Sequence, residues 1–62
     1  MKQLRDYIVN YEVMSDAKYD GAVETMSDSA EHAILIVMRY LRAEYFVNDN
    51  RIKITGIKKK ET

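Results

Sequence analysis

The segment from Ser29 to Val47 is predicted to be a helix that is apolar on two sides, and this feature most constrains the fold. On a helix with about 3.6 residues per turn, its apolar residues form two neighbouring stripes. The first stripe contains Ile34, Val37, Met38, Leu41 and Tyr45, and the second contains Ala33, Ile36, Tyr40, Ala43 and Val47. A helix on the surface of a globular protein normally has one such stripe, so the second stripe needs a cover of its own.

The chain is too short to supply that cover from further layers. Its 62 residues predict one domain, and a domain of this size buries only about 60% of the surface of its unfolded chain. The sequence has no cysteine and one histidine, so we expect no disulfide, no metal site and no cofactor. Oligomerisation is the remaining device that stabilises very small domains. We therefore expect a homodimer with Ile36, Tyr40, Ala43 and Val47 in its interface. The alternative is that the sheet of a single copy covers both stripes.

Two strands are expected before the helix. The first, from Asp6 to Met14, alternates in residue type and is rich in β-branched and aromatic residues. Its core face contains Tyr7, Val9, Tyr11 and Val13. Asp20-Gly21 is a typical hairpin turn, so we expect the second strand to be short, from Ala22 to Met26.

The helix boundaries are predicted from capping signals. Asp28 and Glu31 have the spacing of a capping box, and Ser29 is a competing N-cap. We expect the helix to run to about Phe46 and to be terminated by Asn48-Asp49-Asn50, because asparagine and aspartate tolerate the left-handed backbone conformation that often follows a helix.

A third strand is expected after the helix, from Arg51 to Ile57. Gly56 suggests a bulge that returns Ile57 to the face of Ile52 and Ile54. The elements together predict an α+β fold: a two-layer ββαβ domain in which a small antiparallel three-stranded sheet packs against one helix. We expect residues 1–57 to form this single domain and residues 58–62 to be a basic flexible C-terminal tail.

Charge is segregated along the chain although the formal net charge is zero. The segment from Ser15 to Glu31 carries Lys18 and the acidic residues Asp16, Asp20, Glu24, Asp28 and Glu31. The segment from Arg51 to Thr62 carries Glu61 and the basic residues Arg51, Lys53, Lys58, Lys59 and Lys60. Two oppositely charged surfaces are therefore candidates for partner binding.

The residue pattern does not favour an enzyme. His32 lies close to Asp28 and Ser29, but a helix cap explains that cluster better than catalysis. A carboxylate pair drawn from Glu24, Asp28 and Glu31 needs a cleft that excludes water, and a single-sheet protein has little room for one. The sequence contains no phosphate-binding glycine loop and no metal-protease or thiol-redox motif.

The stretch D-Y-I-V-N-Y-E-V, the later D-G and the S-D before the helix resemble the very small dimeric uracil-DNA glycosylase inhibitors of bacterial viruses. The resemblance implies a homodimer whose apolar groove traps an apolar loop side chain of the host enzyme. It also implies carboxylates that pair with the enzyme's basic DNA-binding surface, so that inhibition is stoichiometric and involves no chemistry. The partner-binding candidates are Glu24, Asp28, Glu31, Asp20 and Tyr40.

Two other functions remain open. The basic segment could bind nucleic acid as an accessory protein, through Arg51, Lys53, Lys58, Lys59 and Lys60. The chain could instead be a structural subunit whose helix docks on a larger assembly.

The N-terminal residues MKQLRDYIVNYE lack the apolar stretch of a secretion signal, and the longest apolar run, Ala33–Met38, is too short to span a bilayer. We therefore expect a cytoplasmic protein with no membrane partner.

Overall fold

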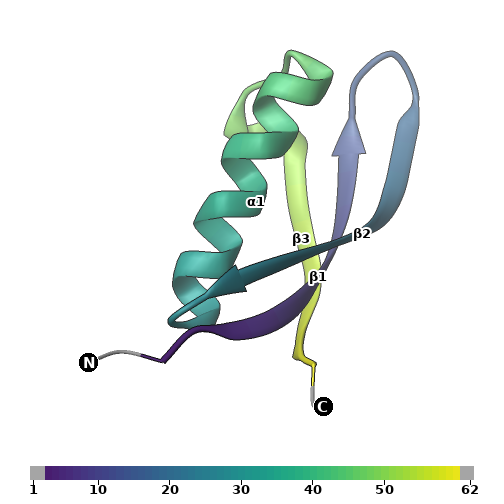
Figure 1. Cartoon of the computed structure of the whole chain (residues 1–62). Helices are drawn as coiled ribbons and strands as arrows, with labels where there is room; N and C mark the ends of the chain where they lie inside the picture. Colours follow the sequence, from purple (N-terminus) through teal and green to yellow (C-terminus); the bar gives the residue numbers. More distant parts are fainter. Residues whose placement is uncertain (1–2, 61–62) are drawn as a thin grey trace.

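The computed structural model describes residues 3–60, which form one three-stranded antiparallel sheet and one long helix (Figure 1). The elements in chain order are β1 (Arg5–Met14), β2 (Lys18–Ser27), α1 (Ala30–Tyr45), the short 3-10 helix η1 (Asp49–Arg51) and β3 (Ile52–Lys59). This arrangement confirms the predicted two-layer α+β fold.

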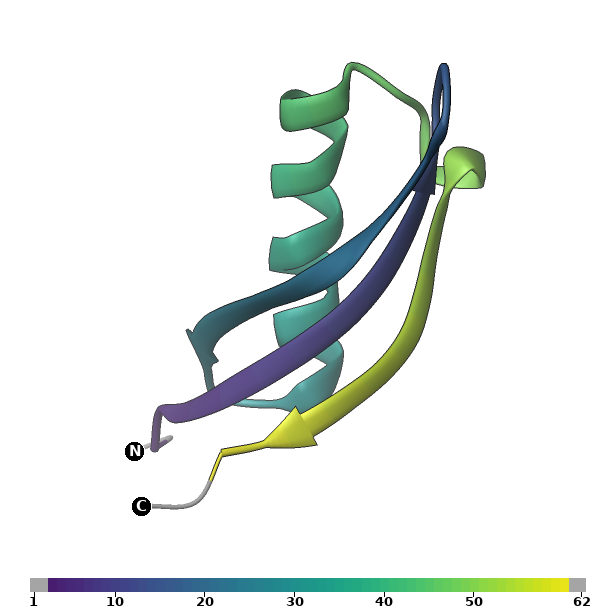
Figure 2. The same cartoon turned by 90° about the vertical axis from the view of Figure 1, so that its right-hand side faces the viewer.

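The strand order in the sheet is β2-β1-β3, so β1 lies in the middle and pairs antiparallel with both neighbours. α1 lies against one face and contacts all three strands (Figure 2). Within residues 3–60, no helix or strand covers the opposite face, which we call the open face. Each strand therefore alternates between residues that point toward α1 and residues on the open face.

The first hairpin turns earlier than the sequence predicts. Met14 pairs with Lys18, and the turn is the Ser15–Ala17 segment, in which the Ser15 amide donates to the Ala17 carbonyl at 3.0 Å. Asp20 and Gly21 lie inside β2, so the prediction of a turn at these residues was wrong. The earlier turn extends the β1–β2 ladder and brings Tyr19 beside Val13, and the extra cross-strand pairs stabilise it.

Gly21 has a packing role that the turn prediction missed. It lies opposite Tyr11, and a Cβ atom added to Gly21 would lie 2.9 Å from the Tyr11 hydroxyl oxygen. The glycine therefore gives the Tyr11 ring room against the edge strand, and its φ angle is not positive. A glycine within a strand often marks such a close approach.

Ser29, and not Asp28, is the N-cap of α1. The Ser29 Oγ accepts a hydrogen bond from the His32 amide at 3.1 Å, while the Asp28 carboxylate lies 3.2 Å from the His32 Nδ1 atom. The capping box predicted from Asp28 and Glu31 is therefore wrong. At the other end of α1, Phe46 has the left-handed conformation, with φ of 54°, in place of the predicted asparagines and aspartate.

β3 contains the predicted bulge. Gly56 pairs with Asn10 and Ile54 pairs with Tyr11, so Thr55 is the extra residue. The bulge returns Ile57 to the core face that Ile52 and Ile54 share, as predicted.

The basic tail begins later than predicted, because Lys58 and Lys59 belong to β3. The Lys60 amide also donates to the Asp6 carbonyl at 2.8 Å, which extends the pairing by one residue. Backbone hydrogen bonds to β1 hold these lysines in place, since β1 is long enough to pair with them. The remaining residues of the predicted tail, 61 and 62, lie outside the described residues.

The core lies between α1 and the sheet. Its buried residues are Tyr7, Val9, Val13, Ala33, Val37, Leu41 and Ile52. The first predicted stripe faces the sheet, with Met38 and Tyr45 partly buried at its side. Ala33, which the sequence places in the second stripe, is fully buried. Its small side chain lies one turn before Val37 and allows close approach of the helix to the sheet.

Candidate interaction surfaces

The acidic candidates divide between two parts of the molecule. Asp20 and Glu24 are exposed on the open face of β2, because the intervening helix-facing residue Val23 packs against the core. Glu31 is exposed in the first turn of α1, and half-buried Asp28 precedes the helix. The structure therefore brings Asp20 and Glu24 together on one face and leaves the other two acids at the helix start.

Tyr40 lies apart from the acids of the open face. It is on α1, on the other side of the sheet, and its side chain is 50% exposed. The large apolar residues of β1 and β2 on the open face are instead Ile8, Met14 and Met26, of which the two methionines are exposed. Sequence reasoning missed these methionines as site residues, although the alternation in β1 already places Met14 opposite the core-facing Val13.

Basic residues of β3 share the open face with these acids. Lys53 pairs with Glu12 and Lys58 pairs with Ile8, and both partners point away from the core. Lys59 pairs with the buried Tyr7 and therefore points to the helix side of the sheet. Arg51 is exposed in η1. The predicted basic set is thus divided between the two sides of the sheet.

Two ion pairs neutralise part of the open face. The Lys60 Nζ lies 3.3 Å from the Glu24 Oε1, and the Lys18 Nζ lies 3.0 Å from the Glu12 Oε1. The hydrogen bond to Lys18 lowers the pKa of Glu12 and raises that of Lys18. The acidic segment and the basic segment, which are rival binding surfaces in the sequence, therefore meet on this face.

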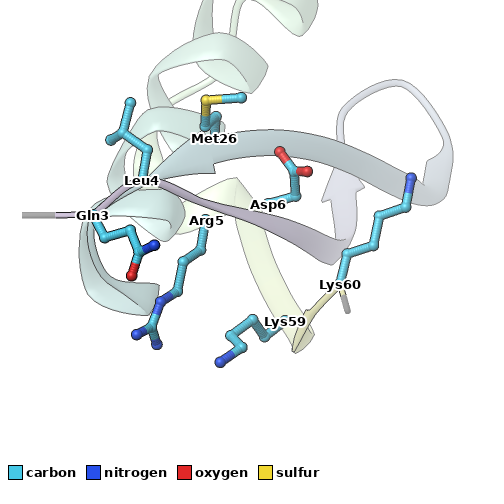
Figure 3. A pocket seen from close by; sticks show the side chains of 7 residues that line it. All are labelled: Gln3, Leu4, Arg5, Asp6, Met26, Lys59 and Lys60. Carbon is cyan, nitrogen blue, oxygen red and sulfur yellow. The ribbon is translucent and has the colours of Figure 1, made fainter. Parts of the chain in front are cut away.

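A hollow of about 450 Å³ lies where the N-terminal end of β1 meets the C-terminal ends of β2 and β3 (Figure 3). Its lining residues are Gln3, Leu4, Arg5, Asp6, Met26, Lys59 and Lys60. Figure 3 shows the Arg5 and Lys59 side chains on one side of the strand ends, with Leu4 and Met26 on the other. Sequence reasoning missed Arg5, because only the register of β1 against β3 brings it near Lys59.

A second hollow, of about 570 Å³, lies across the middle of the sheet. Its lining residues are Asn10, Tyr11, Glu12, Asp20, Gly21, Ala22 and Thr55. The small residues Gly21 and Ala22 leave space here, and the bulge residue Thr55 lines the same hollow. Of the predicted partner-binding acids, Asp20 lines this second hollow, and Glu24, Asp28 and Glu31 line neither of the two.

The second helix stripe is only partly exposed. Ala43 is exposed and Ile36 is half-buried, while Val47 packs against the core. Among residues 3–60, the most exposed large apolar residue is Phe46, at 93%. It follows the last helical residue and lies outside both predicted stripes.

His32 and Ser29 make local contacts at the start of α1. The His32 ring lies against Asp28, and the Ser29 hydroxyl caps the helix. Within residues 3–60, no group of three or more histidine, cysteine, aspartate or glutamate residues could hold a metal ion. The same residues contain no helix that is long and apolar enough to cross a membrane.

Comparisons of the chain with protein-family models, with curated proteins and with solved structures find no match.

Proposed function

We propose that the protein is a non-enzymatic inhibitor that binds a host DNA-processing enzyme stoichiometrically and blocks its DNA-binding site. The acidic open face of β2 carries this proposal. Asp20 and Glu24 point to the same side and lie four residues apart on the strand, which separates them by about 13 Å. Basic clefts that bind DNA phosphates accept carboxylates as charge partners.

Apolar side chains on the same face favour a protein-binding surface over an acidic edge that is simply solvated. Met14 and Met26 are exposed at opposite ends of the β1–β2 hairpin and flank the two acids. Apolar groups beside complementary charges are common in protein interfaces. Uracil-DNA glycosylase is the first target to test, since the first-strand, Asp20-Gly21 and helix-start residues of the chain resemble its small viral inhibitors.

The test is titration of purified uracil-DNA glycosylase with the protein, with residual uracil excision as the readout. We expect loss of activity at a fixed molar ratio of the protein to the enzyme. Glu24→Lys should weaken inhibition at least tenfold, because it places a cation against a basic surface. Asp28→Lys should weaken it through the same repulsion at the helix start.

Glu44→Lys is the matched control, because it makes the same charge change at an exposed position on α1. It should leave inhibition unchanged. Equal loss in all three variants would show that net charge, and not the β2 side, determines binding. No inhibition by the wild-type protein would remove this enzyme as the target, and capture from a nuclease-treated bacterial lysate would then test for another DNA-processing enzyme.

A second candidate function is nucleic-acid binding, which the pairing of β3 favours. Lys58 and Lys59 are held in a strand and not in a free tail. If they and Lys53 contact phosphates, the affinity for DNA should fall steeply with salt, with a logarithmic slope of about −0.9 per contact. Absence of DNA binding at low salt would exclude this function.

A further inference from the structure

The two edges of the sheet differ in their protection against pairing with another strand. β3 has a bulge at Thr55 and carries Lys53, Lys58 and Lys59. Bulges and lysines are devices that keep edge strands from pairing. β2 has neither device along most of its length: its register with β1 is continuous from Ser27 to Lys18, and the strand contains no proline.

β2 is therefore an open pairing edge. β1 occupies one side of it, and within residues 3–60 no strand occupies the other side. Every second residue of such an edge presents an unpaired backbone amide and carbonyl. A strand of ten residues is long compared with the usual five or six, so the unpaired row is extensive.

We propose that β2 pairs antiparallel with β2 of a second copy of this chain, which creates a continuous six-stranded sheet. The two-fold axis of such a pair is perpendicular to the sheet, so both helices lie on the same face. Residues that face each other across an antiparallel pair point to the same side. The axis must therefore pass through a residue that faces its own copy.

Charge excludes Ala22 and Glu24 as that residue, and the length of the pairing favours Val23 over Gly21, whose register places Glu24 opposite Lys18 of the second copy but pairs only residues 18–24. With the axis at Ala22, Asp20 faces Glu24 of the second copy, and with the axis at Glu24 two glutamates face each other; both arrangements are destabilising. With the axis at Val23, Glu24 faces Ala22 of the second copy and Asp20 faces its Met26. This register also pairs almost all of β2, from Tyr19 to Ser27.

The helix supplies apolar side chains on the β2 side. The rings of Tyr19 and Tyr45 are 5.3 Å apart, which places Tyr45 beside β2. Ile34 and Met38 lie on the same side of α1 as Tyr45, at helical spacing, and both are half-buried. Pairing of the two β2 strands brings this side of α1 in one copy toward the same side of α1 in the other. A domain of this size gains stability from the additional burial of apolar surface.

The pairing changes the charge pattern of the open face. Asp20 and Glu24 lie along one edge in a single copy, but the paired strands bring four carboxylates to the middle of a wider face. Adjacent strands are about 4.8 Å apart, so the acids form one strip with lysine-bearing β3 strands at both outer edges. The importance of this strip for inhibition rests on the proposed function, whereas the strand pairing itself does not.

The first test measures the mass of the full chain by light scattering and sedimentation, with no target enzyme present. We expect a concentration-dependent dimer. Ala22→Lys places a cation opposite Glu24 twice per dimer and should lower the dissociation constant roughly tenfold, while Ala22→Glu should raise it by a similar factor. Thr55→Glu is the matched control, because it adds the same charge to an exposed position on the opposite edge strand and should have no effect.

The second test uses the absence of native cysteine. Val23→Cys places two thiols at the axis, where the Cα separation in a strand pair suits a disulfide. We expect oxidative cross-linking of this variant and none for Thr55→Cys or Tyr40→Cys. A monomer at millimolar concentration would overturn the proposal. So would a dimer that cross-links through Tyr40→Cys and not Val23→Cys, since that outcome assigns the interface to the helix stripe.

Discussion

The side-chain amine of Lys60 lies 3.3 Å from the Glu24 carboxylate, and this contact joins two segments that are 36 residues apart. Both groups are about half exposed, so the contact contributes little to stability. Its importance is electrostatic, because it places a cation beside the acid on which the proposed inhibitory surface depends.

Lys60→Gln tests this contact. We expect the free energy of unfolding to change by less than about 0.5 kcal/mol, while binding to a basic partner becomes tighter because Glu24 no longer has a competing cation. Urea denaturation and titration of the target enzyme measure the two quantities. Lys53→Gln is the control, since it removes the same charge elsewhere on β3. An equal gain in both variants would contradict a specific effect of the Lys60–Glu24 pair.

Gly21→Ala should destabilise the fold. The new Cβ would lie 2.9 Å from the Tyr11 hydroxyl oxygen and 3.2 Å from its Cζ atom, so the ring must move. We expect a loss of about 1–3 kcal/mol, measured by urea denaturation. The double variant with Tyr11→Phe should recover part of the lost stability, because the Tyr11 hydroxyl oxygen, the atom nearest to the new Cβ, is then absent.

Gly56→Ala is the comparison for that substitution. Its Cβ would meet only Asn10 Nδ2, at 3.6 Å, which is ordinary contact. It should be neutral or stabilise the protein slightly, by up to about 1 kcal/mol. If Gly21→Ala proves as mild as Gly56→Ala, the Tyr11 ring does not require the glycine.

Phe46→Gly should stabilise the protein. Phe46 has a left-handed backbone, with φ of 54°, which is unfavourable for a residue with a Cβ, and its side chain is 93% exposed. Glycine has no such penalty at a helix C-terminus, so we expect a gain of about 1 kcal/mol in the free energy of unfolding. Phe46→Ala keeps the Cβ and should show no gain. Equal gains for glycine and alanine would attribute the effect to the exposed ring and not to the backbone.

Alkaline pH should destabilise the fold partly through Tyr11. Burial, followed by interactions with Tyr45, raises the pKa of Tyr11 above its ordinary value of 10.0. The folded state therefore favours the neutral phenol. The resulting stability is fully present below the unfolded pKa and is lost as pH rises through the raised folded pKa.

Urea denaturation between pH 8 and pH 11 measures this loss. Tyr11→Phe should lose less stability over that range than the wild-type protein. The shifts of Tyr19 and Lys18 have the same sign and are common to both proteins, so the difference between the two curves isolates Tyr11. Parallel curves would show that Tyr11 does not contribute.

The local residue pattern was sufficient to predict the elements in which apolar residues recur at a regular spacing. The alternation in β1 correctly predicted the core-facing Val9 and Val13, and the first helix stripe correctly predicted Val37 and Leu41. The glycine in the third strand correctly predicted the bulge before Ile57. In each case the spacing of apolar residues along the chain determines which side chains can leave water together.

The sequence alone determined which segments form the strands and the helix and which of their residues face the core. The tertiary structure decided where the turns lie, where the strands end and which charged residues meet. Asp20-Gly21 could form a turn by itself, but the longer β1–β2 ladder and the Tyr11 ring place it inside a strand. Lys58 and Lys59 could be a tail, but β1 offers them backbone partners. Glu24 and Lys60 are 36 residues apart along the chain, and only the sheet register brings them together. Turns, caps and ion pairs depend on small free-energy differences, and contacts between distant segments are large enough to decide them.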